Sequence, residues 1–558
     1  MLASTENAMM PARDAFDSAG YRAERRCAAA VNAAVRGAIW LAVLLCLCLA
    51  GSNPLFAQQE RKRDTGVVAG VAKEAKTRPW ARSSVTHHVI EIRGRRLAYT
   101  ARAGMVDVTG TDAKTRGRIF FVAYTEDGAN PRSRPLTFAF NGGPGAASAY
   151  LHLLALGPRI VALKDDGSIP SPPVHLVDNP ATWLDFTDLV FVDPVGTGYS
   201  RAISPEKGKD AKQKPGAGDA SHFWNVNADL DSLAEFIRLY LTGTQRWASP
   251  KFLAGESYGA FRAAILPNRM TSKPGVRLNG VVLISPVFEF SLRRFTAYRL
   301  LPWASMLPAY AATALYHHKS SVAGKLPDVL SETEGFAMGG YLTWLARQKP
   351  SDNDLVVQKL SAYLGLSRDM ILRHHGRISR TVFAKNLLRD SGRVVSPYDG
   401  TITEVDPHPD SPFLEGDDPV LNGLSAPLTA AFNEYVRSEL DFETQRPYRV
   451  LNPTTSRKWR WETDGHFQRI GAANDLKEAM SLNPNLKVLI AHGAYDMVTP
   501  YLASKYVVRH MALDPSIASN VTFKVYDGGH MPYTHAAVRA ALHQDTRTFF
   551  HDALKGAN

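Results

Sequence analysis

The chain is poor in cysteine. Its 558 residues include three cysteines, and Cys27, Cys46 and Cys48 all lie among the first 50 residues. The remainder of the chain therefore has no thiol nucleophile and no disulfide framework. Any covalent chemistry must come from another type of side chain.

Signatures of nucleic-acid, metal and cofactor binding are also missing. The net charge is +12, but the basic residues are scattered along the chain and form no recognisable nucleic-acid-binding motif. No zinc, phosphate or dinucleotide signature is present. We interpret the positive charge as a solvated surface. We expect no nucleic-acid partner, no metal and no cofactor.

Long apolar runs are absent except for one, Gly37–Ala50, which follows the basic residues Arg22, Arg25, Arg26 and Arg36. A basic flank before a short apolar run predicts a signal peptide over residues 1–57, with cleavage after Ala57. The run is short for a membrane-spanning helix. We expect a periplasmic or secreted protein; the alternative is an uncleaved anchor in the inner membrane.

The rest of the chain has the apolar content of a globular protein, at 45% overall. Residues 58–84 are charged, without apolar periodicity, and are expected to form a linker. A hairpin is predicted over 85–100, with its turn at Arg93-Gly94, followed by a strand over 118–124.

Short apolar runs then predict buried parallel strands at Leu136–Phe140, Leu189–Asp193, Phe252–Ala254, Val281–Ser285, Lys487–Ala491 and Thr522–Tyr526. Helical patterns alternate with them, including Ala260–Arg269. We expect a core of residues 85–289 and 481–558. A mainly helical cap insertion, residues 290–480, is expected to cover the face where the strands end.

Three segments following these strands suggest nucleophilic catalysis. Ser257 lies in Gly255-Glu256-Ser257-Tyr258-Gly259, between a predicted strand and a predicted helix. The flanking glycines permit the sharp strand-to-helix turn that exposes a nucleophile.

A serine hydroxyl needs a base, and the base needs an anion to orient it. His530 follows the last predicted strand in Gly528-Gly529-His530, and Asp496 follows the strand before it. We predict His530 as the base and Asp496 as its partner. The nearest rival, Asp527, is interpreted as a turn residue. The order Ser, Asp, His is that of an α/β-hydrolase, with a mostly parallel central sheet and helices on both faces.

The segment Asn141-Gly142-Gly143-Pro144-Gly145 follows another predicted strand. Its glycines allow backbone N–H groups to approach an oxyanion closely. We predict the N–H groups of Gly143 and Tyr258 as the two donors of an oxyanion hole.

Taken together, these segments resemble the serine carboxypeptidase family. The matches include Asn141–Gly145, Phe191–Ser200, Gly255–Gly259, Asp496 with Pro500, and Gly529-His530-Met531. The resemblance spans about 135–290 and 480–535. The family usually has tryptophan where this chain has Phe140. Its eukaryotic members have disulfides, so the leader and the missing cysteines suggest a bacterial envelope enzyme.

The resemblance implies release of C-terminal amino acids from peptides and proteins. It implies that Asn141 and Glu256 bind the terminal carboxylate of the substrate. Two carboxylates at hydrogen-bond distance cannot both stay ionised, so Glu256 is expected to carry a proton and to donate. We therefore expect activity at acidic to mildly acidic pH. The alternatives are an esterase or acyltransferase on the same machinery, or a catalytically idle envelope binding protein.

Overall fold

The computed structural model describes residues 80–109, 116–203, 220–347, 354–461 and 470–555. The expected signal peptide, 1–57, and residues 58–79 of the expected linker lie outside the described residues. Residues 80–84, which we also expected in the linker, form the start of the first strand.

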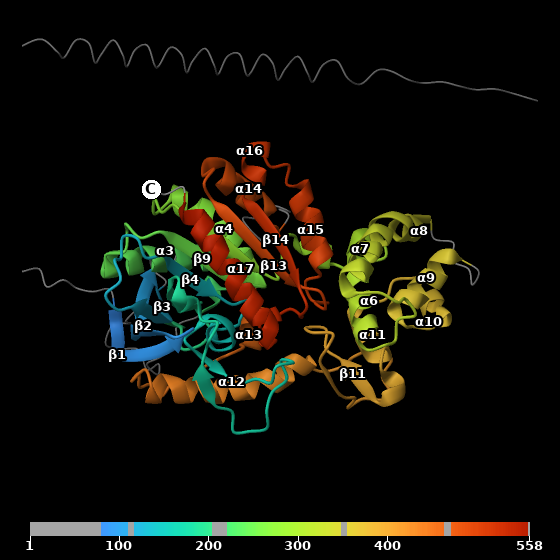
Figure 1. Ribbon diagram of the computed structural model, residues 1–558, viewed down its shortest axis with the longest axis horizontal. Coiled ribbons are helices and arrows are strands. Elements are labelled where there is room, and N and C mark those ends of the chain that lie inside the picture. Colours follow the sequence, from blue (N-terminus) through green and yellow to red (C-terminus); the bar gives the residue numbers. More distant parts are fainter. Residues whose placement is uncertain (1–79, 110–115, 204–219, 348–353, 462–469, 556–558) are drawn as a thin grey trace, which may run out of the picture. The chain divides into compact units, whose positions relative to one another are not determined.

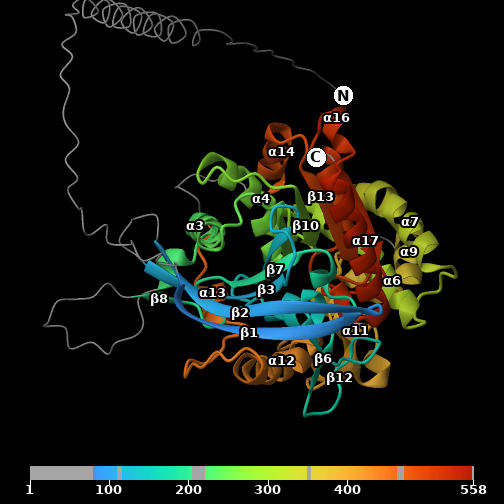
Figure 2. The same ribbon diagram turned by 60° about the vertical axis from the view of Figure 1, so that its left-hand side comes forward.

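A central sheet organises the described residues (Figures 1 and 2). The sheet has ten strands in the order β1-β2-β3-β7-β4-β9-β10-β13-β14, with β8 also paired to β3. The strands are β1 (Trp80–Ile92), β2 (Arg95–Thr109), β3 (Arg116–Glu126), β4 (Leu136–Phe140), β7 (Asp188–Asp193), β8 (Arg201–Ile203), β9 (Lys251–Glu256), β10 (Gly280–Ile284), β13 (Lys487–Gly493) and β14 (Val521–Tyr526). Two small antiparallel pairs join β5 (Arg159–Val161) to β6 (Leu176–Asp178) and β11 (Arg393–Val395) to β12 (Thr403–Val405).

The structure confirms the predicted strands, but the hairpin extends over 80–109 instead of 85–100, and β14 is not buried as predicted, because it is an edge strand of the sheet. β1 and β2 form the expected hairpin, whose turn residues Arg93 and Gly94 both have positive φ angles. The pairs from β7 through β4, β9, β10 and β13 to β14 are all parallel. This topology, with helices between the parallel strands, confirms the predicted α/β-hydrolase fold.

Helices connect and cover these strands. Those associated with the sheet are α2 (Ala149–Leu151), α3 (Val226–Thr244), α4 (Tyr258–Ser272), α12 (Pro419–Ser438), α13 (Pro453–Arg457), α14 (Ala473–Leu482), α15 (Tyr501–His510), α16 (Pro515–Ala518) and α17 (Ala536–Leu554). A separate group contains α5 (Leu300–Ser305), α6 (Leu307–Tyr316), α7 (Leu326–Phe336), α8 (Leu342–Arg347), α9 (Leu355–Leu364), α10 (Arg368–Arg373) and α11 (Arg380–Asn386). The short helices are η1 (His152–Leu156), η2 (Trp183–Asp185), η3 (Ala220–Phe223), η4 (Phe290–Arg293), η5 (Ala337–Tyr341), η6 (Arg389–Ser391) and η7 (Pro532–Thr534).

Two apolar cores form because successive side chains of a strand point to opposite faces of the sheet. Phe252 and Ala254 of β9 join α17 and α12 in one core. Leu253, between them, joins α3, α4 and α14 in the other. Both faces of the inner parallel strands β4, β7, β9 and β10 are thus covered, which explains their largely apolar sequences.

The helices α5–α11 occupy the interval between β10 and β13, although these two strands are adjacent in the sheet. Figure 1 shows α6–α11 gathered in yellow and yellow-green beside α15. They have their own core, which Met497, Tyr501 and Leu502 of the β13–α15 region enter. α14 falls within the range 290–480, yet it packs on α4 at the sheet.

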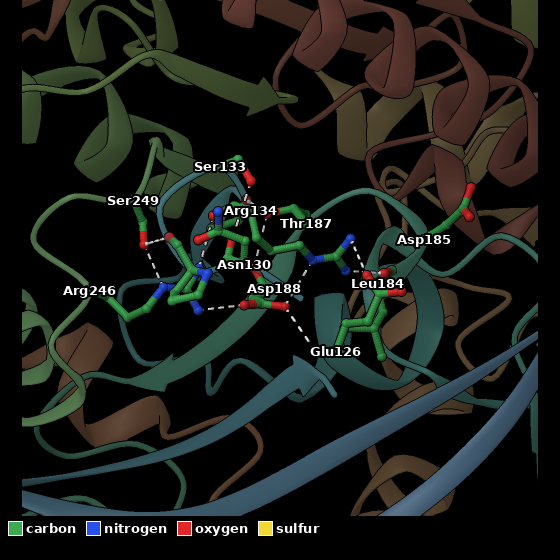
Figure 3. A network of polar contacts seen from close by, with 12 residues as sticks. Glu126, Asn130, Ser133, Arg134, Leu184, Asp185, Thr187, Asp188, Arg246 and Ser249 are labelled. Atoms are coloured by element: carbon green, nitrogen blue, oxygen red, sulfur yellow. Dashed lines mark hydrogen bonds and ion pairs between the residues drawn. The ribbon is translucent and has the colours of Figure 1, made fainter. Parts of the chain in front are cut away.

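A buried charge network lies at the edge of the sheet where β4, β7 and β9 begin, opposite their carboxyl ends (Figure 3). Asp188, at the start of β7, accepts from Arg134 Nε at 3.1 Å and from Arg246 Nη1 at 2.5 Å. Arg134 also pairs with Glu126 at 2.6 Å. Asp188 is 1% exposed, and its buried carboxylate is shared by the two guanidinium groups.

We predict that Asp188→Ala destabilises the protein strongly, because it leaves Arg134 and Arg246 without their shared carboxylate. The expected loss in the free energy of unfolding is about 3–5 kcal/mol. Urea denaturation measures it. The control is Asp107→Ala, which breaks the exposed pair with Arg118 and should cost about 0–1 kcal/mol. Equal losses in the two variants would contradict the role of Asp188.

Candidate active site

The predicted site residues follow strands that end at one edge of the sheet. Phe140 of β4 pairs with Gly255 of β9, and Glu256 pairs with Ile284 of β10. The carboxyl ends of parallel strands are where α/β folds place their ligand sites. Register therefore brings the segments after β4, β9, β13 and β14 to this edge.

Ser257 lies at a strained turn between β9 and α4. Its backbone has φ 59° and ψ −121°, a conformation that residues other than glycine rarely adopt. The backbone N–H of Ser257 donates to the carbonyl of Ile284 at 2.9 Å, which holds the turn against β10. Ser257 is half-buried.

The glycines on either side of Ser257 are required by backbone contact. A Cβ on Gly255 would lie 2.1 Å from the carbonyl oxygen of Gly259, and one on Gly259 would lie 2.2 Å from that of Phe140. A Cβ on Gly142 would lie 2.6 Å from the backbone nitrogen of Tyr258. The β9–α4 turn and the segment after β4 thus meet backbone to backbone.

The structure brings Asp496 and His530 together. His530 Nδ1 lies 2.8 Å from Asp496 Oδ2, and both side chains are fully buried. The other oxygen of Asp496 accepts the backbone N–H groups of Val498 and Thr499, each at 2.8 Å. Asp527, in contrast, is exposed.

Neighbouring charges shift the pKa values of both Asp496 and His530. Burial disfavours the charge on His530, but the carboxylates of Asp496 and Glu256 outweigh it and raise its pKa to about 9. Burial likewise disfavours the Asp496 anion, but His530 and the hydrogen bonds from Thr499 lower its pKa to about 2. Asp496 is therefore a permanent anion at neutral pH.

Asn141 and Glu256 are hydrogen-bonded beside the imidazole. Asn141 Nδ2 donates to Glu256 Oε2 at 2.5 Å, while its Oδ1 accepts the N–H of Leu151 at 2.9 Å. The second oxygen of Glu256 lies 3.2 Å from His530 Nε2. One carboxylate thus contacts both the amide and the imidazole.

A buried arginine fixes the backbone of Asn141. Arg262, on α4, donates to the Asn141 carbonyl at 2.6 Å and pairs with Asp229 of α3 at 2.7 Å. Its guanidinium also lies 4.7 Å from the ring centre of Tyr258. The side chain of Tyr258 is therefore packed into the core, and its backbone N–H is the part that remains at the turn.

The two N–H groups predicted as oxyanion donors have no acceptor among the described residues. Tyr258 is the first residue of α4, so its N–H has no partner within the helix. Gly143 has a φ of 100° and precedes a cis peptide bond to Pro144.

Ser257 and His530 are not hydrogen-bonded to each other in the described part of the chain. The buried Nε2 of His530 lies 3.2 Å from Glu256 Oε1, without the geometry of a hydrogen bond. Hydrogen bonds between a nucleophile and its base are often long in unliganded sites. Nε2 is the ring nitrogen left for this role, because Nδ1 is engaged by Asp496.

Sequence reasoning missed two residues at the site. The Thr499 hydroxyl donates to Asp496 Oδ2 at 2.6 Å and lies 3.0 Å from His530 Nδ1. The spacing Asp496-x-x-Thr499, typical of a side-chain-capped turn, could have indicated it. The ring of Tyr398 packs edge-on against His530 at 5.0 Å. Nothing in the sequence near residue 398 signals this contact.

The described residues contain no group of three or more His, Cys, Asp or Glu side chains that could hold a metal ion. Nor do they include a helix whose length and apolar character would suffice to cross a membrane.

Comparison with known proteins confirms the resemblance inferred from the motifs. Residues 94–307 match the family described as serine carboxypeptidase. Serine carboxypeptidase-like 16 of Arabidopsis thaliana is 28% identical over 186 residues, which are 31% of this chain and 38% of the relative. Pheromone-processing carboxypeptidase KEX1 of Colletotrichum graminicola is 28% identical over 211 residues, 35% of this chain and 28% of the relative.

These matches thus cover less than half the length of the curated relatives. Among solved structures, the proline iminopeptidase of Mycobacterium smegmatis aligns with 81% of this chain and 100% of its own, at 14% identity and a TM-score of 0.34.

We predict that Asp496→Asn lowers the pKa of His530 well below 9, because it removes the anion at Nδ1 while burial still disfavours the imidazolium. An NMR titration of the His530 ring protons measures this pKa. Asp527→Asn is the matched control and should leave the titration unchanged. An unchanged pKa in Asp496→Asn would contradict the paired arrangement.

Proposed function

We propose that this chain is an exported serine-type carboxypeptidase that removes C-terminal residues from peptides or proteins through an acyl-enzyme on Ser257. In this proposal residues 1–57 direct export or anchor the chain in the inner membrane. Residues 290–480 form a cap on the catalytic face. The family match over residues 94–307 supports the reaction class.

The observation that carries the proposal is the position of Glu256 between Asn141 and His530. An amide and a carboxyl group beside the base can hold the terminal carboxylate of a peptide and align its last peptide bond with Ser257. An esterase that accepts blocked substrates has no need of such a pair. Binding energy at the carboxylate would thus be used to orient the scissile bond.

The chemistry follows the roles proposed for three side chains. The Ser257 hydroxyl attacks the carbonyl carbon of the last peptide bond and gives its proton to His530 Nε2. The imidazolium then donates that proton to the leaving amine, and the C–N bond breaks to give the acyl-enzyme. Water enters, loses a proton to His530 and attacks the acyl carbon; the C–O bond to Ser257 then breaks, Ser257 takes the proton back from His530, and the shortened peptide leaves. Asp496 holds the Nδ1–H throughout.

The charge that develops on the carbonyl oxygen needs donors that are already in place. In this proposal the N–H groups of Gly143 and Tyr258 supply them. Their lack of other acceptors supports this role, because donors already engaged elsewhere would have to break a hydrogen bond first.

Glu256 and His530 are close enough to share one proton, since Glu256 Oε1 lies 3.2 Å from His530 Nε2. Without substrate, the imidazole carries that proton at neutral pH. The arriving carboxylate of the peptide repels an anionic Glu256. The shared proton then moves to Glu256, which donates it in a hydrogen bond to the substrate and leaves Nε2 free as the base.

The proton shared by Glu256 and His530 sets the pH dependence of the activity. Activity requires one proton on the pair. Acid adds a second proton and blocks the base. Alkali removes the shared proton as pH rises through the His530 pKa of about 9, and Glu256 then repels the substrate as an anion. We therefore propose activity on the acidic to mildly acidic side and a fall at alkaline pH.

We predict that the wild type trims peptides one residue at a time from a free C-terminus and leaves C-terminal amides intact. Ser257→Ala should trim neither, because it lacks the attacking oxygen. Mass spectrometry of both peptides after incubation at mildly acidic and neutral pH measures the products. A folded wild type that trims nothing but hydrolyses small esters would indicate an esterase or acyltransferase. A folded wild type that trims no peptide, hydrolyses no ester and fails to react with a fluorophosphonate would indicate a binding protein.

We predict that Glu256→Gln abolishes the alkaline fall of kcat/KM on free-carboxylate peptides, because the amide donates a hydrogen bond at every pH. The acid limb of the variant should then report the pKa of His530 alone, which lies below 9 because one of the two carboxylates that raise it is gone. Rates measured from pH 4 to pH 10 give both limbs. A wild-type kcat/KM that keeps rising to about pH 9 would contradict the proposed role of Glu256 in binding the substrate carboxylate.

A further inference from the structure

The six residues Ser396–Thr401, which we call the strap, enter the catalytic face from the interval between β10 and β13. The strap follows β11, labelled in Figure 1 below α11, and precedes β12. Its two ends close on each other, because the Ser396 N–H donates to the Ile402 carbonyl at 2.9 Å. The strap is a compact loop whose middle residues face the loops after β13 and β14.

The strap contacts the His530 loop at the backbone and at the ring. The His530 N–H donates to the carbonyl of Tyr398 at 2.6 Å. The Tyr398 ring meets the imidazole edge-on, with centroids 5.0 Å apart and an interplanar angle of 84°. A Cβ on Gly529 would lie 2.4 Å from the Tyr398 carbonyl oxygen and 2.5 Å from Asp399 Cβ. Only glycine fits at 529 with the strap in place.

The same six residues also bind the loop that carries Asp496. The Gly400 N–H donates to the Tyr495 carbonyl at 3.2 Å, and the Met497 N–H donates to the Pro397 carbonyl at 3.0 Å. These contacts flank Asp496 on both sides in sequence. The strap is therefore hydrogen-bonded to both loops whose side chains must meet for Asp496 to hold His530.

Side chains fix the strap from two directions. Asp399 Oδ2 lies 2.8 Å from Nε2 of His535, and its Oδ1 accepts the N–H and the hydroxyl of Thr401. Asp418, the first residue before α12, accepts the Ser396 hydroxyl at 2.6 Å and the Tyr398 N–H at 3.0 Å. The Asp399–His535 pair is the ionic link between the strap and the region that follows His530.

We propose that the strap positions the imidazole of His530 against Asp496, and that Asp399 is the positioning residue that keeps the strap seated, through its ion pair with His535. This inference rests on the proposed function, because it assigns a role in that reaction to the segment 396–401. It also gives the interval between β10 and β13 a second role besides covering the site.

The charges around His535 set the pH range of the link. Burial disfavours the imidazolium, but Asp399, Asp527 and Asp166 outweigh it and raise the pKa of His535. Burial and the same three carboxylates also raise the pKa of Tyr316.

A raised pKa means that the ion pair is complete below the ordinary pKa of histidine. It is lost as pH rises through the pKa in the folded state. The strap is therefore held most firmly under mildly acidic conditions. Arg539, on α17 beside His535, donates instead to the carbonyl of Tyr533 at 3.0 Å.

The test compares Asp399→Asn and His535→Gln with the wild type. Both should lower kcat on a small ester by about 10- to 100-fold with little change in KM, because a displaced base slows the chemistry without altering binding. The double variant should be no slower than either single variant, since both remove one link. NMR should show the pKa of His530 falling below about 9 in each, as the imidazole moves away from Asp496.

The control is Glu334→Gln. It removes the ion pair of α7 with Lys505 of α15, 2.6 Å long, which also joins the inserted helices to the core but does not touch the strap. The titration of His530 and kcat should not change in this variant. His535→Gln leaves the bonds of Asp399 to Thr401 intact, so it provides the test if Asp399→Asn fails to fold.

Two results separate the positioning role from the proposed function. Folded Asp399→Asn and His535→Gln proteins with unchanged kcat and an unchanged His530 titration would overturn the role of the strap and leave the carboxypeptidase proposal standing. A wild type without hydrolytic activity, whose His530 titration nevertheless shifts in both variants, would overturn the function and leave the positioning role standing.

Discussion

The backbone of the β9–α4 turn lies in direct contact with the backbone after β4, and the rest of the site depends on this approach. Gly142, Gly255 and Gly259 have no room for a Cβ, because carbonyl oxygens or a backbone nitrogen occupy that space. The approach holds Ser257 at a positive φ. A strained conformation of this kind persists only where the surrounding structure enforces it. Here the hydrogen bond of Ser257 to β10 and the start of α4 do so.

The same contact sets the electrostatics of the site. Because the two backbones touch, Asn141 and Glu256 come within hydrogen-bond distance, and Glu256 in turn reaches His530. The imidazole thus lies between two carboxylates, one at each nitrogen. Asp496 also receives two backbone N–H groups and a hydroxyl, and it stays ionised. Glu256, in contrast, accepts one hydrogen bond from the Asn141 amide.

Much of the fold could be predicted from the sequence because the parallel strands are buried on both faces. Runs such as Leu136–Phe140 have no polar alternation, which is typical of that environment. The order of Ser257, Asp496 and His530 after three predicted strands then indicated the fold. Asp496 could be preferred over Asp527 because Asp527 lies three residues before the histidine, a spacing typical of a turn residue. The structure places the first in contact with His530 and the second in solvent.

Contacts between segments distant in sequence could not be predicted. Tyr398 reaches His530 across more than a hundred residues, through a carbonyl and a ring that carry no motif. The salt link of Asp399 to His535 has the same origin. Both depend on how the interval between β10 and β13 folds, and its helices α5–α11 are specified by their own core rather than by the sheet. Local patterns report which face of an element is apolar, but not which loop of another element it meets.

The place of the insertion in the sheet explains why it can act on the catalytic loops. β10 and β13 are parallel neighbours, so the inserted residues leave the sheet at the edge where Ser257 and Asp496 lie and re-enter it at the opposite edge. Helices attached at that edge must pack near the loop after β13, and Met497 and Tyr501 enter their core. An insertion elsewhere could cover this edge of the sheet without touching the loops of Asp496 and His530. Here the core of α5–α11 includes residues of the loop that carries Asp496, and the strap is hydrogen-bonded to both loops. If the strap positions His530 as we propose, variation in the insertion would alter the reactivity of the site.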